Sequence, residues 1–193
     1  DLRAFHGQVF RGGNALLVIA GPVQPEEAAA TARRAFEAMP AGPPLPLRRL
    51  REPGSGPFTR HVDHEASQVE MMLSFPAVGL TDPRVQGIAL IQMILGDGVT
   101  SRLQWNVCEM RALAYSIYAQ YDPMADVGVL DVEAAVAPDG YLDLMREVLD
   151  TLRGFKDRGP TEAEVERART RYRLALEFAQ DSPSVLAGYH LSQ

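Results

Sequence analysis

The sequence has few of the features that would assign a class at once. Its single cysteine, Cys108, excludes an internal disulfide. Its longest apolar runs, residues 14–23 and 88–95, fall short of the roughly 20 residues that cross a bilayer, and residues 1–10 lack the pattern of a signal peptide. A net charge of −6 argues against a nucleic-acid partner. We therefore expect a globular domain without a membrane span.

Lysine is also scarce, because all basic residues except Lys156 are arginine. Together with the alanine, proline and glycine content, this favours a GC-rich bacterial source. We therefore expect a soluble domain of the bacterial cytoplasm or periplasm. The composition does not separate these two compartments.

Regular elements follow one another along the first part of the chain. Residues 1–10 have the spacing of a helix, the apolar run 14–23 is typical of a strand buried on both faces, and residues 25–39 form a second helix. Residues 40–57 are rich in proline and glycine and indicate an extended linker. We therefore expect a junction and strand–helix unit over 1–39, the linker over 40–57, and a main domain over 58–193 that is truncated at its C-terminal end.

The main domain combines strands and helices in separate groups. Alternating residues predict a strand that includes 69–75, a buried helix over 85–96, a short helix, and two strands that form a hairpin over 114–136. Residues 142–158 and a segment capped by Thr161 and Glu164 predict two final helices. This order indicates an α+β fold, a two-layer sandwich of a mostly antiparallel sheet packed against helices.

The segment His61–Glu65, "HVDHE", contains two histidines and two acids and invites a test for zinc binding. Zinc peptidases use H-E-x-x-H or H-x-x-E-H, with two histidines four apart on one helix face. Here the order is H-x-x-H-E on strand-like sequence, so His61 and His64 point to opposite faces and cannot hold one ion. Because the other histidines, His6 and His190, lie near the two ends, we favour a solvated polar strand over a weak metal contact.

Three further features have competing interpretations. The loop "GDGVTSR", which contains Gly98, could offer backbone N–H groups to an anion, although a tight turn is favoured. Cys108 could be a nucleophile, but a lone helical cysteine is more often a small packing residue. Tyr115 could donate a hydrogen bond to a ligand or lie in the core as a strand aromatic, and periodicity does not separate these alternatives.

Several motifs occur in an order that is shared with a known family. A buried helix ends at Gly96, a turn with Gly98 leads to Ser101–Leu103, and a further helix leads to "LAYS", Leu113–Ser116. With these motifs, residues 80–139 resemble the second-half domain of the insulinase, pitrilysin and mitochondrial processing peptidase family of zinc metallopeptidases. The segment "FHGQVFRGGNALLVIAGPV" also resembles the family's junction after its first domain. The resemblance extends over nearly the whole chain.

The resemblance implies a metal-free half of such a peptidase, because H-x-x-E-H is absent from the sequence. We expect no bound cofactor in this chain and no catalysis by the chain alone. Zinc is expected in a partner domain, either in the same polypeptide or on another subunit. The two domains would close around an extended peptide, with this chain as part of the peptide-binding chamber and the interface. The alternative is a scaffold or interaction module with no role in substrate binding.

The resemblance also assigns candidate site residues. Metal-free domains of the family often supply an arginine and a tyrosine, seven residues apart, that bond the substrate backbone near the scissile carbonyl. Tyr115 matches the tyrosine, whereas the arginine position falls on Cys108, which carries no charge. Arg111, one helical turn later, is a candidate replacement. The predicted substrate-binding residues are Tyr115, Ser101, Arg102 and Gly98, and no metal ligand is predicted.

Overall fold

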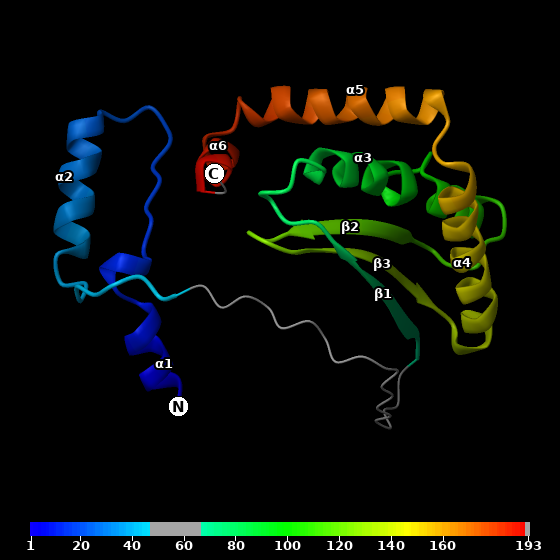
Figure 1. Cartoon of the computed structure of the whole chain (residues 1–193), viewed down its shortest axis with the longest axis horizontal. Coiled ribbons are helices and arrows are strands. Elements are labelled where there is room, and N and C mark those ends of the chain that lie inside the picture. Colours follow the sequence, from blue (N-terminus) through cyan, green and yellow to red (C-terminus); the bar gives the residue numbers. More distant parts are fainter. Residues whose placement is uncertain (47–66, 192–193) are drawn as a thin grey trace. The chain divides into compact units, whose positions relative to one another are not determined.

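The computed structural model describes residues 1–46 and 67–191 (Figure 1). The chain divides into two compact units, which we describe separately. One comprises Asp1–Pro53 with Leu174–Gln193, and the other comprises Gly54–Arg173. The predicted "HVDHE" strand and most of the predicted linker lie outside the described residues.

The second unit is built on a three-stranded antiparallel sheet. Its strands are β1 (Val69–Ala77), β2 (Ile117–Pro123) and β3 (Gly128–Val136), in the spatial order β1-β3-β2. β2 and β3 form the predicted hairpin, and in the middle of the sheet Val132 lies opposite Leu73 and Ala119. The prediction of a mostly antiparallel sheet in an α+β fold is confirmed.

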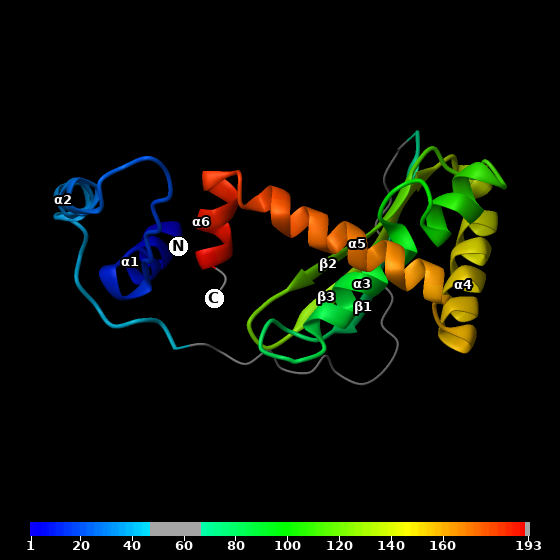
Figure 2. The ribbon, with the colours of Figure 1, turned by 90° about the horizontal axis from the view of Figure 1, so that it is seen from above.

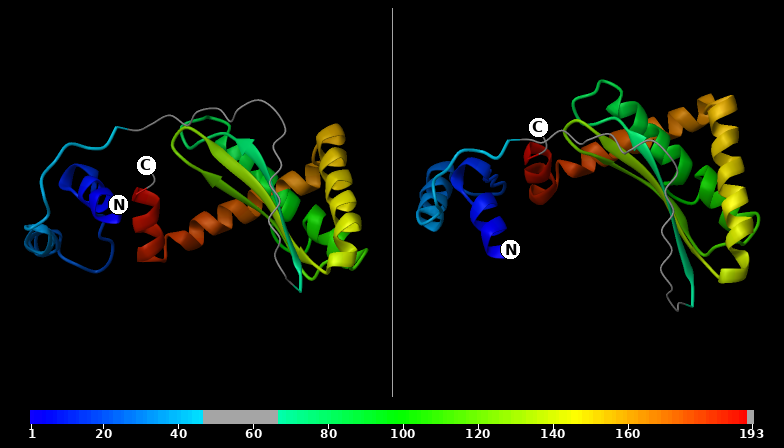
Figure 3. Two further views of the ribbon diagram at one scale, coloured as in Figure 1. Left: turned by 90° about the horizontal axis from the view of Figure 1, so that it is seen from below. Right: turned by 60° about the horizontal axis from the view of Figure 1, so that its bottom comes forward.

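Each strand directs one set of alternating side chains to the core and the other set outward. On β3, Val132, Ala134 and Val136 are buried, while Asp131 and Glu133 lie on the opposite face. The helices pack on the buried face: α3 (Val85–Gly96) lies on β2, and α4 (Tyr141–Arg158) contacts the short π-helix η2 (Gln104–Glu109) (Figure 2). The left view of Figure 3 shows the sheet with α3 behind it.

The hydrophobic core gathers side chains from every layer of this unit. Leu103, Val107, Leu144 and Val148 come from the helical side and pack against the sheet. All of these side chains are fully buried, as is Val132 on the central strand. The last residue of α3, Gly96, packs so closely on the backbone of Ala119 that a Cβ atom would collide with it. The small residue therefore lets α3 approach β2.

The connection between the last two long helices follows the predicted signals. Gly159 ends α4 with φ +71°, a conformation that side chains disfavour. Thr161 and Glu164 then form the predicted capping box: Thr161 N–H donates to Glu164 Oε2 (2.7 Å), and Glu164 N–H donates to Thr161 Oγ1 (3.3 Å). α5 (Glu162–Ala179) begins here, and the unpredicted helix α6 (Pro183–Leu191) follows it.

The first unit has little interior of its own. Its N-terminal segment contains α1 (Leu2–Val9), the 3₁₀ turn η1 (Gly12–Asn14) and α2 (Pro25–Phe36), and neither α-helix has a buried residue. The prediction of a buried strand over 14–23 is wrong, because residues 15–20 join no sheet and Leu16 is 70% exposed. A strand needs a neighbour for its N–H and C=O groups, and the described residues offer none to this run.

Candidate functional site

Tyr115 lies at the surface immediately before β2. Its side chain is 98% exposed, which excludes the core position that the sequence left open. The preceding residues Leu113 and Ala114 pack against the core, and Leu113 N–H donates to Val107 O (2.9 Å). These contacts fix the backbone on which Tyr115 stands. Its hydroxyl forms no hydrogen bond with any described residue.

A groove on the outward face of the sheet includes Ser116, the residue after Tyr115. Its volume is about 380 Å³, and it is lined by Glu70, Met71, Met72, Ser116, Tyr118, Glu133, Ala134 and Ala135. Tyr118 donates its hydroxyl to Glu133 Oε2 (2.6 Å), which raises the pKa of the phenol. No sequence motif pointed to this groove. The alternation of β1 and β3 was the available signal, since it directs Glu70 and Glu133 to the same face.

Cys108 occupies η2 on the helical side of the sheet. Its side chain is partly buried against the core. Burial raises the pKa of the thiol, and the nearby Glu109 carboxylate raises it further. A neutral thiol is a poor nucleophile and a weak donor, so the environment favours packing over catalysis. The position expected to hold an arginine is therefore chemically unlike arginine.

Arg111 is paired with a residue of α4. Its Nε lies 2.9 Å from Glu147 Oε2, whose side chain is largely buried. Arg111 also lines a polar pocket of about 540 Å³, together with Thr100, Arg102, Trp105, Asn106, Glu147, Asp150, Thr151, Arg158 and Glu164. Tyr115 does not line this pocket. The guanidinium that could replace the missing arginine is thus held by Glu147.

Arg102 links the "GDGVTSR" loop to the start of α5. It donates from Nε to Glu164 Oε1 (2.6 Å) and from Nη2 to Glu164 Oε2 (2.7 Å), with a further bond to Gly159 O (3.0 Å). The guanidinium also lies 5.0 Å from the ring centre of Phe155. These hydrogen bonds, with burial opposing them, lower the pKa of Glu164 to about 2. Arg102 therefore holds two parts of the fold together.

No metal centre is found in the part of the chain that the structure describes. No group of three or more His, Cys, Asp or Glu side chains in 1–46 and 67–191 could hold an ion. His6 instead stacks on Phe10, with ring centroids 4.4 Å apart. Within the same ranges, every helix is too short or too polar to cross a membrane.

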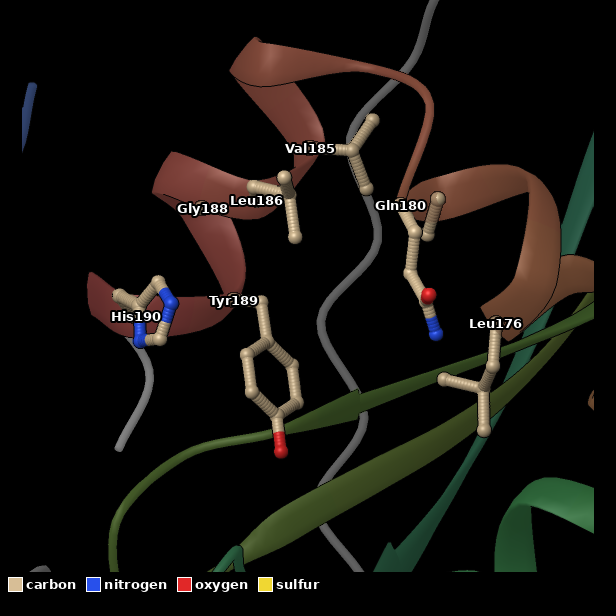
Figure 4. Close-up of a pocket in the computed structure, with 8 residues that line it drawn as sticks. Leu176, Gln180, Val185, Leu186, Gly188, Tyr189 and His190 are labelled. Carbon is tan, nitrogen blue, oxygen red and sulfur yellow. The ribbon is translucent and has the colours of Figure 1, made fainter. Parts of the chain in front are cut away.

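A larger pocket lies at the C-terminal end of the described chain. It encloses about 930 Å³ between the end of α5 and α6, and its lining is mainly apolar (Figure 4). Leu176 and Gln180 contribute from the α5 side, and Val185, Tyr189 and His190 contribute from α6. The pocket brings together none of the predicted site residues, so it adds no chemistry to the candidate site.

The structure thus defines an α+β domain with an exposed tyrosine and no metal centre among its described residues. The family model of the peptidase M16 inactive domain matches residues 1–172. An uncharacterized zinc protease of Mycobacterium tuberculosis is 30% identical over 187 residues, which cover 95% of this chain and 43% of that protein. A second one, from Rickettsia bellii, is 29% identical over 178 residues, which cover 92% of this chain and 42% of the relative. The chain belongs to the peptidase M16 inactive domain family.

Solved structures give the same result for the fold. The peptidase M16 inactive domain from Pseudomonas fluorescens superposes with a TM-score of 0.75 and 26% identity, over 89% of this chain and 42% of that one. A protease from Helicobacter pylori superposes with a TM-score of 0.68 and 17% identity, over 88% of this chain and 42% of that one. The chain spans less than half the length of the curated relatives that it matches.

Proposed function

We propose that this domain is a non-catalytic wall of the peptide-binding chamber of a zinc protease. It lies against a zinc-bearing domain, in the same polypeptide or on a partner subunit, and contributes no metal ligand. Family membership and the relatives described as zinc proteases support this proposal. The observation that carries it is the exposed Tyr115, whose hydroxyl is available to a substrate carbonyl.

The sheet register supports a single substrate-binding region. β1 begins at Val69, opposite the end of β3, and β2 begins at Ile117, opposite Ala134 near that same end. Tyr115, the start of β1 and the outward groove therefore lie at one end of the sheet. An extended peptide bound there meets both a hydroxyl donor and the outward-facing side chains.

The two edges of the sheet differ in their availability to a peptide backbone. At the β2 edge, Gln92 of α3 donates its Nε2 to Ala119 O (2.7 Å), which occupies a carbonyl group. β1 has β3 as its one hydrogen-bonded neighbour within the described residues. We therefore place the peptide along β1, where main-chain bonds give affinity that tolerates many sequences. Substrate contacts by Gly98, Ser101 and Arg102 remain predictions of the family resemblance.

One observation favours the alternative of a scaffold without a role in substrate binding. Cys108 occupies the expected arginine position, and Arg111 is paired with Glu147. If the domain does bind substrate, Tyr115 acts without an arginine beside it. In the proposed mechanism, a hydroxyl that donates to the developing oxyanion still lowers the barrier, because this hydrogen bond strengthens as charge develops in the transition state.

The test compares Tyr115→Phe with the wild type in the protease that contains this domain. We expect kcat/KM for an unstructured peptide to fall about tenfold to a hundredfold, with the loss mainly in kcat. Tyr141→Phe on the helical side is the matched control and should leave both constants unchanged. Equal kcat/KM for wild type and Tyr115→Phe would instead establish the scaffold alternative.

A further inference from the structure

The "GDGVTSR" loop and α5 line a fourth, smaller cavity, in addition to the three pockets described above. Its volume is about 40 Å³, and it is lined by Met93, Ile94, Thr100, Ser101, Glu164, Arg167, Ala168 and Arg171. We propose that this cavity binds a small oxyanion of the size of phosphate. The proposal does not rest on the proposed function: it uses Ser101, which the family resemblance assigns to substrate binding, but neither Tyr115 nor the outward groove.

Ser101 provides the main observation. The residue is 3% exposed, and its Oγ has no hydrogen-bond partner among the described residues. A buried hydroxyl without a partner costs about 1–3 kcal/mol, so such groups usually bond a ligand or a water. Ser101 is among the residues that line the cavity, and a ligand that reached its Oγ would complete the hydrogen bonding of this hydroxyl.

The charges around the cavity favour an anion. Arg167 and Arg171 stand one turn apart on the same face of α5, and both line the cavity. Arg171 Nη2 lies 2.9 Å from Asp97 Oδ2, whereas Arg167 has no ion pair within the described residues. The one carboxylate in the lining belongs to Glu164, and both of its oxygens accept hydrogen bonds from Arg102. With Arg171 paired to Asp97 and Arg102 paired to Glu164, Arg167 leaves one net positive charge beside the cavity.

The loop is fixed in place before any ligand binds. Arg171 donates from Nη1 to Asp97 O, in addition to its ion pair with the Asp97 side chain. Gly98 has φ +89° and lies against the same guanidinium. Because these contacts hold the loop on α5, binding requires little ordering of the backbone, which lowers its entropic cost.

The size of the cavity distinguishes an oxyanion from a single water. One water needs roughly 10–15 Å³ of such volume, and about 40 Å³ is present. The space is therefore sufficient for a tetrahedral oxyanion whose oxygens accept from Ser101 Oγ and the Arg167 guanidinium. A cluster of waters is the rival occupant.

The proposal is tested with inorganic phosphate and the 193-residue chain. Titration of the chain into phosphate should broaden the ³¹P resonance in a saturable way, at constant ionic strength. Arg167→Gln and Ser101→Ala should each raise the dissociation constant about tenfold or more, since each removes a hydrogen bond to an anion. Arg169→Gln changes an exposed arginine of α5 that does not line the cavity, and it should bind phosphate like the wild type.

Thermal unfolding gives a second readout that does not depend on any one variant. Phosphate should raise the Tm of the wild type and of Arg169→Gln more than it raises the Tm of Arg167→Gln. Equal Tm shifts in all variants would reflect the general exclusion of phosphate from protein surfaces and would overturn the proposal. Absence of saturable ³¹P broadening with the wild type would also overturn it, and would leave water as the occupant.

Discussion

The two compact units use apolar sequence in opposite ways. The central strand β3 has a neighbour on each side, and Val132 in its middle is fully buried. The run 15–20 in the first unit is at least as apolar, but it joins no sheet and its Leu17 is half-exposed. All the buried hydrophobic residues among those described belong to the second unit.

The difference shows that the apolar character of a run does not by itself make a strand. β3 satisfies its backbone groups on both sides, through β1 and β2, and buries one face beneath the helices. The run 15–20 has neither kind of partner within the described residues. Strand formation is thus a property of the neighbours as much as of the run.

An aspartate introduced into each segment gives the largest expected difference in the free energy of unfolding. Val132→Asp places a charge in the core without a partner and should reduce the free energy of unfolding by about 4 kcal/mol. Leu17→Asp, in the exposed run of the 193-residue chain, should change it by less than about 0.5 kcal/mol. Urea unfolding monitored by circular dichroism measures both values. A large loss of unfolding free energy with Leu17→Asp would show that residues 15–20 are buried, as Val132 is.

A smaller effect concerns the ion pair that ties α5 to its own unit. The pKa of Glu164 is lowered from 4.5 to about 2, first by the hydrogen bond from Arg102. A lowered carboxyl pKa stabilises the fold fully above about pH 4.5, and the stabilisation is lost as pH falls towards 2. Glu164→Gln should therefore be less stable than the wild type by about 2 kcal/mol at pH 5.5, and the difference should nearly vanish at pH 2.

The matched control for this pair is Glu166→Gln on the same helix. Glu166 is exposed and forms no ion pair within the described residues. Its unfolding free energy should follow that of the wild type at every pH between 2 and 5.5. If Glu164→Gln retains its full deficit at pH 2, the Arg102 ion pair is not the source of the stability.

Much of the fold could be predicted because the residues that determine its elements lie close together in the sequence. Thr161 and Glu164 are three residues apart and form the predicted capping box, and β2 and β3 pair through a short turn. The strand over 14–23 could not be judged in this way, because a strand depends on neighbours that are distant in the sequence. The Arg102–Glu164 pair spans 62 positions and has no local signature.

The candidate site was less predictable than the fold for a related reason. Whether Tyr115 faces the core or the solvent depends on the turn before β2, where Ala112 adopts φ +50° and changes the direction of the chain. Neither the period of a helix nor that of a strand extends through such a turn. The pairing of Arg111 with Glu147 likewise depends on how η2 packs against α4.

The smallest expected effect compares two glycines of the second unit that differ in the space around them. At Gly98, φ is +89° and a Cβ atom would lie 3.0 Å from Arg171 Nη1, so alanine strains the backbone and displaces the guanidinium. At Gly87, in the first turns of α3, nothing lies within 4 Å of the Cβ position. Gly98→Ala should lower the free energy of unfolding by about 1 kcal/mol, and Gly87→Ala should raise it by about 0.5 kcal/mol. Urea unfolding of the two variants should therefore give shifts of opposite sign. Shifts of the same sign would mean that the contact between Gly98 and Arg171 does not hold the "GDGVTSR" loop against α5.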